Sequence, residues 1–236
     1  MYAFRLAVAL HLAIGLAAPT VRAASLTVAP TRIDLLAGDT AAAVTLQNNE
    51  PQPVMVQVQT FAWPDGPATA ALVPTRELIA VPPVFEIAES GRQIIRVALR
   101  APLPGPREHA FRLLITEVPR GSARTTGVRF ALRLSLPVFV TPDGAEARPV
   151  WSVRANEHGT PELVLRNEGE AHIQVRRIVW RLDGRAAATV IEAPAYVLAG
   201  REHDWPLPPG TGAASLEIEA ETNLGLLRAT VASSRG

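Results

Sequence analysis

Histidines are the residues of this chain best suited to bind a metal or transfer a proton near neutral pH. The chain contains five of them, at His11, His109, His158, His172 and His203. No two stand at the spacing of a metal-binding pair, such as the i, i+4 pair of a helical zinc motif. We therefore interpret each of them as an ordinary surface or half-buried side chain and not as a ligand.

Other groups that could carry chemistry are also missing from the sequence. There is no cysteine, which excludes thiol catalysis, thiolate metal sites and disulfide exchange. The glycine-rich nucleotide-binding motifs and the GxSxG and HExxH motifs of hydrolases do not occur. Glu217, Glu219 and Glu221 alternate as on the solvent face of a strand, which is an ordinary position for them. The sequence therefore predicts no enzymatic activity, no cofactor and no metal site.

The stretch around which the chain is organised is a predicted strand, GVRFALRLSLPVFV, at residues 127–140. Large apolar side chains stand at every second position, at Val128, Phe130, Leu132, Leu134 and Leu136. A period of two indicates a strand, because a helix would scatter these side chains around its axis. A row this long must be covered by its own domain or by another protein, and the sequence leaves both alternatives open.

The first residues of the chain have the features of a secretory signal peptide. Residues 1–23 contain a short head with Arg5, an apolar run from Leu6 to Ala18, and a small-x-small cleavage site. The apolar run is short for a membrane span, so we expect no membrane insertion. Without Arg5 and Arg22, 21 basic residues remain against 22 acidic ones. This balance does not suggest nucleic acid or an anionic membrane as the partner.

After the signal peptide, short strand-like runs alternate with turns rich in the chain's 21 prolines and 16 glycines. Two segments, VTLQNNEPQPVMVQ and LVLRNEGEAHIQVR, repeat at an offset of 119 residues and align Asn48 with Asn167. We interpret them as two related β-sandwiches in tandem, at residues 24–143 and 144–236. A chance likeness between any two sandwiches is the alternative. Pro30 predicts an edge strand or a strand that changes sheets.

Taken together, these features resemble the periplasmic chaperones of chaperone–usher pilus assembly. The likeness rests on PPVFEIAESGRQIIRV, FRLLITEVP and the alternating strand ending in VFVTP, in that order. It covers nearly all of residues 25–142 and, more weakly, the second domain. The pair AFRLLITEVP and LSLPVFVTP is similar to the archaic, spore-coat-U (Csu-like) branch. The resemblance implies an all-β fold of two immunoglobulin-like domains, a periplasmic location, no enzymatic activity and no cofactor.

The resemblance also implies a mechanism. Pilus subunits of this system are immunoglobulin folds that lack their last strand, and the chaperone's long strand fills the resulting groove by strand addition. Here the donated residues would be Val128, Phe130, Leu132 and Leu134. The subunit would then pass to an outer-membrane usher. Because an exposed apolar strand can pair with a second copy, a self-capping dimer of the empty chaperone is an open alternative.

Members of this family anchor the terminal carboxylate of the subunit with two basic residues. Arg32 in PTRIDL matches the first of them, and a guanidinium suits a carboxylate because it donates two parallel hydrogen bonds. A solvated charge on an edge strand is the alternative for Arg32. Better-known members have a lysine where this chain has Pro137, and the chain contains no lysine. We take Arg112 as the hypothetical substitute. Thr141 replaces an arginine of those members, so we expect no interdomain ion pair from it.

Two other functions are kept as alternatives. A secreted structural pilus subunit or adhesin-like binding module would share the sandwich fold, and self-polymerisation would favour it. A metal-dependent sandwich enzyme is the second alternative, and stoichiometric bound metal would favour it.

Overall fold

The computed structural model describes residues 26–64, 72–119, 131–182, 189–192, 194–208, 211 and 215–232. The predicted signal peptide lies outside these residues, and so do Val128 and Phe130 of the predicted donor strand. Over the described residues the fold consists of strands and turns, which confirms the predicted all-β class. None of the described segments forms a helix long and apolar enough to cross a bilayer.

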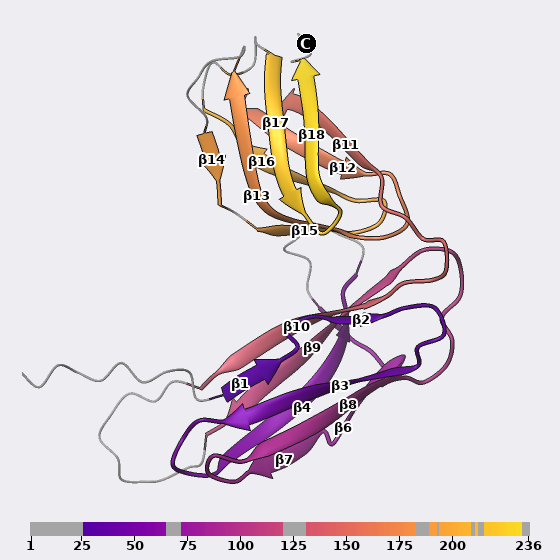
Figure 1. The fold of residues 1–236 in the computed structure, drawn as a ribbon, viewed down its shortest axis with the longest axis vertical. Coiled ribbons are helices and arrows are strands. Elements are labelled where there is room, and N and C mark those ends of the chain that lie inside the picture. The colour runs from indigo at the N-terminus through magenta and orange to yellow at the C-terminus, as the bar shows by residue number, and fades with distance from the viewer. Residues whose placement is uncertain are drawn as a thin grey trace, which may run out of the picture.

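The N-terminal domain is built from ten strands within the described residues (Figure 1). These strands are β1 (Leu26–Ala29), β2 (Ile33–Leu35), β3 (Ala41–Asn48), β4 (Val54–Ala62), β5 (Val73–Pro74), β6 (Leu78–Val81), β7 (Val84–Ile87), β8 (Arg92–Leu99), β9 (His109–Val118) and β10 (Arg133–Val140). One sheet has the order β1-β3-β8-β6. The other has the order β2-β10-β9-β4-β5, and β7 also pairs with β4.

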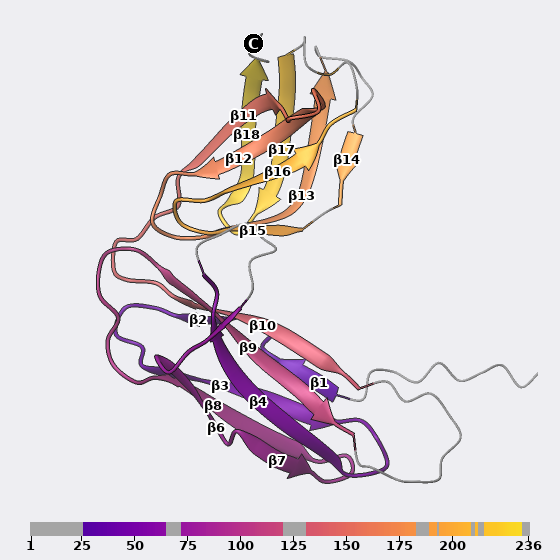
Figure 2. The same ribbon diagram turned by 180° about the vertical axis from the view of Figure 1, so that it is seen from behind.

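The C-terminal domain contains eight strands in the part of the chain that is described. These strands are β11 (Pro149–Ala155), β12 (Pro161–Asn167), β13 (Ile173–Leu182), β14 (Thr189–Ile191), β15 (Ala195–Val197), β16 (Glu202–Pro206), β17 (Ser215–Thr222) and β18 (Gly225–Ala232). One sheet has the order β11-β12-β16 and the other the order β14-β13-β17-β18, with β15 also paired to β13. Figures 1 and 2 show the two sandwiches following one another along the long axis, with their strands inclined to each other.

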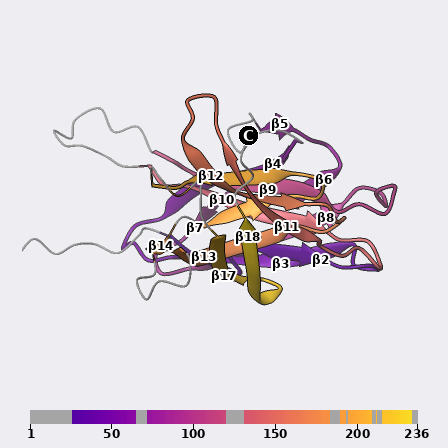
Figure 3. The ribbon, with the colours of Figure 1, turned by 90° about the horizontal axis from the view of Figure 1, so that it is seen from above.

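Alternation of apolar and polar residues explains why these segments form half-buried strands. In β4, Val54, Val56 and Val58 are buried, whereas Gln57 and Gln59 point outward. This period of two places one face of the strand on the core and leaves the other to solvent. Each domain has its own apolar core, built around side chains such as Phe111 in the first and Trp205 in the second. Figure 3 shows the sheets of both domains from above.

The chain changes sheets at Pro30, as one of the two alternatives from the sequence predicted. Before it, β1 pairs antiparallel with β3 in one sheet of the N-terminal domain. After it, β2 pairs parallel with β10 in the other sheet. Pro30 lacks a backbone N–H and therefore cannot continue a ladder, so the strand is interrupted at this position. The change of sheet brings Arg32 next to β10.

Asn48 and Asn167 make equivalent hydrogen bonds in the two domains, which supports the predicted repeat. The Asn48 side-chain amide donates to the carbonyl oxygens of Gln52, Ile87 and Ala88 at 2.8, 3.3 and 2.9 Å. The Asn167 amide donates to those of Ala171, Val197 and Leu198 at 2.7, 3.1 and 3.3 Å. Both asparagines are fully buried. A buried amide must find such partners. Each asparagine therefore connects its own turn to the end of a strand in the other sheet, β7 in the first domain and β15 in the second.

In the described residues the predicted long strand begins only at Arg133, later than its alternation suggests. β10 begins at Arg133, and Ala131 and Leu132 precede it without being part of the strand. The register explains this, because Arg133 is paired with Thr116 near the end of β9. One further backbone hydrogen bond, from Glu117 N to Leu132 O at 2.9 Å, closes the ladder. A strand needs a partner for its backbone groups, and β9 ends at Val118.

Candidate binding site at the domain junction

The two predicted anchor arginines lie in one row across the sheet of the N-terminal domain. Pro137 of β10 is paired with Arg112 of β9. On the other side of β10, Val138 is paired with Ile33 of the parallel strand β2. One residue before this pair, Arg32 therefore lies beside Pro137. Residues paired across neighbouring strands point to the same face of a sheet. Arg32 and Arg112 therefore emerge from the same outer face, on either side of the position where the family lysine would stand.

The next row on this face makes aromatic contacts with the C-terminal domain. Phe139 stacks on His172, with ring centroids 3.6 Å apart and an interplanar angle of 11°. Trp63 meets Tyr196 edge-on at 5.7 Å, and Phe139 lies 5.5 Å from the same tyrosine ring. The edge-on contact of Trp63 with Tyr196 is one of the favourable geometries for aromatic pairs. These rings fix the outer face of the N-terminal sheet against the second domain.

Arg112 is held over aromatic rings and has no carboxylate partner. Its Cζ lies 3.6 Å from the centroid of the Trp63 ring and 5.9 Å from that of Tyr196. Burial lowers the pKa of Arg112 below its usual value, with the electrostatic effect of Tyr196 acting in the opposite direction. A guanidinium nevertheless stays charged in a protein. No described residue forms an ion pair with it, so its hydrogen-bond donors are available to an incoming anion.

Arg32 is in a different state, since part of its guanidinium is already bound. Its Nε donates to Asp34 Oδ2 at 2.9 Å, with both side chains about one-third exposed. Its Nη1 donates to Gln174 Oε1 in the C-terminal domain at 3.0 Å. Arg32 is thus half-buried and connects the two domains. It is not the fully solvated charge on an edge strand that the sequence left as an alternative.

A second group of polar residues at the junction was missed from the sequence. His172 is only 7% exposed and its Nδ1 lies 2.9 Å from Glu108 Oε1. The backbone N of His172 donates to the same carboxylate at 3.0 Å, and Thr141 Oγ1 donates to it at 2.8 Å. His172 was expected at the surface or half-buried, and this was wrong. Its sequence context gives no sign of its partner, because Glu108 stands 64 residues away.

Thr141 has no charge with which to form an ion pair between the domains, but it supports a hydrogen-bonded contact between them indirectly. Its hydroxyl helps to hold the Glu108 carboxylate that meets His172. The backbone N of Glu108 also donates to Glu170 O at 2.8 Å. The interdomain connection that other family members were expected to make with an arginine at this position therefore runs here through Glu108 and His172.

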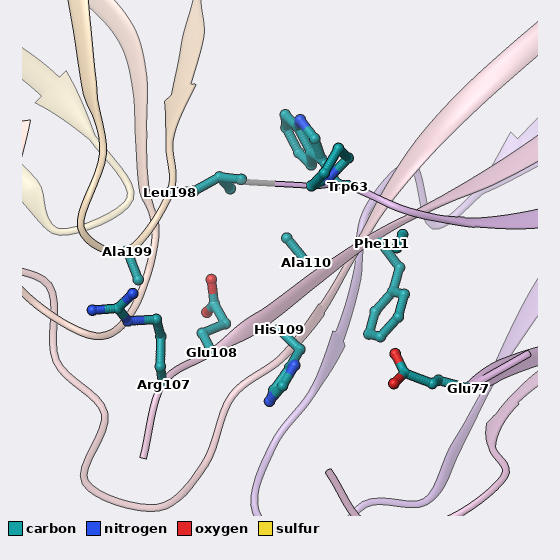
Figure 4. Close-up of a pocket in the computed structure, with 11 residues that line it drawn as sticks. Trp63, Glu77, Arg107, Glu108, His109, Ala110, Phe111, Leu198 and Ala199 are labelled. Carbon is teal, nitrogen blue, oxygen red and sulfur yellow. The ribbon is translucent and has the colours of Figure 1, made fainter. Parts of the chain in front are cut away.

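Two cavities flank this connection. One of about 270 Å³ is lined by residues that include Trp63, Arg107, Glu108 and Leu198 (Figure 4). In Figure 4, Arg107 and Glu108 reach from the N-terminal domain toward the segment of Leu198 and Ala199. The other cavity, of about 530 Å³, contains Arg32, His172 and Leu224 in its lining. Glu108 lines both cavities, so it is part of the wall between them.

β10 has one open edge, on the side of β2 and Arg32, whereas Arg112 stands across β10 on its paired side. It pairs with β9 along its whole length but with β2 only from Val138 to Val140. The bond from Glu117 N to Leu132 O shows that even-numbered residues of this strand bond to β9. The N–H and C=O groups of Arg133 and Ser135, and the C=O of Pro137, therefore point to the opposite edge. Within the described residues no strand covers this edge.

The apolar row of β10 faces the core of its own domain, and its burial decreases toward the beginning of the strand. Val138 is fully buried and Leu136 is 4% exposed. Leu134 and Leu132 are only half-buried, although both pack against the same core. Arg133 and Ser135, on the other face, are exposed. The row thus begins at the rim of the sandwich, where its side chains are incompletely covered.

A comparison with protein families identifies the family to which this chain belongs. Residues 25–146 match the family described as pili and flagellar-assembly chaperones, PapD N-terminal domain. The match covers just over half of the chain. The chain belongs to this family. The predicted resemblance to pilus chaperones is thereby confirmed, and β1 to β10 form the chaperone domain that defines the family.

Solved structures of pilus chaperones share the fold over both domains. The chaperone–tip subunit complex CsuC–CsuE, from the archaic Csu pili of Acinetobacter baumannii, matches with a TM-score of 0.71 at 23% identity, covering 90% of this chain and 100% of that chain. The SafA pilin–SafB chaperone complex of Salmonella enterica gives 0.63 at 18%, covering 89% and 97%. The E. coli chaperone DraB gives 0.62 at 17%, also covering 89% and 97%. No curated protein sequence matches this chaperone.

These matches confirm the fold of two immunoglobulin-like domains expected for the chaperone. No group of three or more His, Asp or Glu side chains in the described residues is arranged to hold a metal ion. The roles predicted for Arg32, Arg112, Leu132 and Leu134 stay predictions, although the structure brings the two arginines to one face. The same holds for Val128 and Phe130, which lie outside the described residues.

Proposed function

We propose that this protein is a periplasmic chaperone that captures pilus subunits by strand addition at the open edge of β10. The subunit's terminal carboxylate is anchored by Arg112 and Arg32. The observation that carries the proposal is the unpaired edge of β10, which ends beside Arg32, together with Arg112, an arginine without a carboxylate partner on the neighbouring strand β9. An incoming strand finds backbone partners and a charge partner at the same place.

The open edge supplies the main-chain part of the interaction. Arg133 and Ser135 present N–H and C=O groups outward, and a strand placed about 4.8 Å away can pair with them. Pro137 has no N–H, and the ladder with the subunit weakens there. Beyond Pro137 the edge is covered by β2. The subunit strand therefore ends close to Pro137, which is where the row of arginines begins.

The apolar row supplies the side-chain part. The half-buried Leu132 and Leu134 pack on their own core but keep surface exposed at the rim. A subunit whose sandwich lacks one strand covers the remaining exposed surface with its own core residues, and each side chain contributes a part of the roughly 1.5–3 kcal/mol that burial from full exposure would give. Val128 and Phe130 continue the alternation in the sequence and extend the contact into the subunit groove.

Arg112 takes the place of the lysine that better-known members have in the long strand. It stands on β9, directly opposite Pro137, so its Cα is displaced sideways by one strand spacing of about 4.8 Å. The length of an arginine side chain compensates for a displacement of this size. A planar guanidinium also binds a carboxylate through two parallel hydrogen bonds.

The remaining partners follow from the same function. The relatives crystallised with a tip subunit and with a pilin support pilus subunits as the cargo. Delivery to an outer-membrane usher, and a mature chain of residues 24–143 and 144–236 that acts in the periplasm after removal of residues 1–23, belong to the proposal. A second copy of the chain can pair at the same open edge, which gives a self-capping dimer when no subunit is bound.

Ser135→Pro tests the strand addition. The substitution removes an N–H that points to the open edge and leaves the ladder to β9 intact. Capture of pilus subunits from the host's periplasm by the tagged variant should fall at least tenfold, as measured by quantitative mass spectrometry. Thermal unfolding should change little. Ser135→Thr keeps the N–H and serves as the matched control.

The same measurement separates the alternatives. Undiminished capture by Ser135→Pro would contradict pairing at this edge. If the tagged wild-type protein captures no pilus subunits from cells that express them, the structural or adhesin-like role would be favoured. Growth of the purified protein into polymers would favour that role as well.

A further inference from the structure

Tyr196 brings a polar group of the C-terminal domain to the two anchor arginines. It lies in β15 and is paired with Gln174 of β13. Gln174 in turn accepts the interdomain hydrogen bond from Arg32. The tyrosine ring packs against Trp63 and Phe139, at 5.7 and 5.5 Å between centroids. The backbone and the ring are thus both fixed, which determines where the hydroxyl group stands.

The environment of this hydroxyl is strongly positive. The charges of Arg32, Arg112 and Arg176 all act on it, against the single negative charge of Asp34. Burial is the largest influence on the group and raises the pKa of Tyr196 above its usual value, whereas the three arginines lower it. The phenol therefore stays protonated at neutral pH and can donate a hydrogen bond. No hydrogen bond joins the hydroxyl to a described residue.

A negatively charged hydrogen-bond acceptor would suit this site, because the Tyr196 hydroxyl can donate a hydrogen bond and the surrounding arginines attract negative charge. A carboxylate has two oxygens with about four acceptor sites, and one guanidinium fork uses two of them. A further acceptor site is then open to a neutral O–H donor from another direction. A phosphate group would also find donors here, but the proposed occupant of the arginine row is the end of a peptide strand.

We propose that the Tyr196 hydroxyl is a third donor to the subunit's terminal carboxylate, contributed by the C-terminal domain. This inference rests on the proposed function, because it concerns the same anchor site. Arg112 and Arg32 come from the N-terminal domain and Tyr196 from the C-terminal domain, so the two domains hold one carboxylate together. The chaperone recognises a free chain end through groups that converge only when the domains are docked.

The test compares two peptides that differ only in the anchored group. The acetylated hexapeptide TVTVTV is titrated into the protein with a free terminal carboxylate or with a terminal amide, and binding is followed by NMR. The wild-type protein should bind the acid at least tenfold more tightly than the amide. Tyr196→Phe keeps the ring and removes one hydrogen bond to a charged group, so it should reduce this preference about tenfold. Affinity for the amide should stay unchanged.

Two controls keep the outcome specific. Arg177→Gln removes a charge from a surface ion pair with Glu221 and should not change the preference for the acid. A ¹³Cζ label on tyrosine reports the hydroxyl directly, since Tyr2 and Tyr196 are the two tyrosines of the chain. The Tyr196 signal should shift on addition of the acid and not of the amide, and this measurement needs no variant.

The possible failures are distinguishable. If the wild-type protein does not prefer the acid, the carboxylate anchor itself is wrong. If the preference disappears in Arg112→Gln but is unchanged in Tyr196→Phe, the anchor stands and the role of Tyr196 is overturned. The role of Tyr196 would also be overturned if its ¹³Cζ signal did not shift on addition of the peptide with the free carboxylate.

Discussion

The two sides of the domain junction differ in how completely their charged groups are satisfied. On one side, the Glu108 side chain is only 2% exposed and its carboxylate accepts hydrogen bonds from Thr141 and His172. On the other, Arg112 rests on Trp63 and has no carboxylate among the described residues. Arg112 lies in β9, and Glu108 stands four positions earlier, directly before the first residue of that strand.

The difference shows which side holds the protein together and which side binds. A buried carboxylate that is fully hydrogen-bonded stabilises one arrangement of its neighbours, and removal of a partner is costly. A half-buried guanidinium without an anion is already partly desolvated, so an incoming carboxylate displaces little water and gains a strong hydrogen bond. We therefore assign Glu108 and His172 to domain docking, and Arg112 to recognition.

Charge reversal at Arg112 should produce the largest change on the binding side. Arg112→Glu places a carboxylate where the subunit's carboxylate is expected, so capture should fall about a hundredfold or more, equivalent to about 3 kcal/mol. Quantitative pull-down from periplasmic extract measures it. The unfolding midpoint should fall only slightly, because the cation–π contact with Trp63 is lost but no ion pair is. Arg177→Glu, at a surface ion pair away from the junction, is the matched control. Normal subunit capture by Arg112→Glu would contradict the assignment of Arg112 to recognition.

Neutralising Glu108 should affect stability more than binding. Glu108→Gln replaces one acceptor oxygen by a donor, which leaves either Thr141 or His172 without its partner. The expected loss is about 1–3 kcal/mol of unfolding free energy, measured by urea denaturation. Glu77→Gln, on the lining of the same cavity, should have little effect. A variant with wild-type stability but poor subunit capture would reverse the assignment of this side.

The smallest effect is expected at Asp34. This carboxylate binds the Nε of Arg32 at 2.9 Å and so competes with an incoming anion for the same side chain. Asp34→Asn should tighten subunit capture about two- to fivefold, since exposed ion pairs contribute only about 0.2–1 kcal/mol. Capture measured over a range of salt concentrations should also become more salt-dependent, because an acidic charge is removed from the site. Weaker capture by Asp34→Asn would mean that Asp34 orients Arg32 for the subunit.

Much of the fold follows from local patterns in the sequence. Alternation in β4 and β10 specifies strands with one buried face, and Pro30 specifies an interruption. The repeated asparagines, Asn48 and Asn167, indicate two domains of one type, because a buried amide requires the same turn in each. Alternation overestimated the length of β10, since periodicity records which face a side chain prefers and not how far the partner strand extends.

The candidate site was only partly predictable. Arg32 stood out because it matches the first basic residue of the family, and Arg112 because the chain has no lysine and this arginine lies on the neighbouring strand in a family motif. The role of His172 was missed, because its stacking on Phe139 and its bond to Glu108 join two domains. Trp63 and Tyr196 were missed for the same reason, since no spacing within one strand relates them.

The sequence by itself therefore determined the strands, the two domains, and the absence of cysteine and lysine, which leaves arginine as the permanently charged basic side chain. These are properties of neighbouring residues, and the preferences of the backbone and of apolar side chains act over a few positions. Only the tertiary structure decided that Arg32 and Arg112 flank Pro137, that the edge of β10 is open on the side of Arg32, and that Glu108 is satisfied while Arg112 is not. Strand register and domain docking join residues far apart in the chain, and the free energy of those contacts depends on the whole fold.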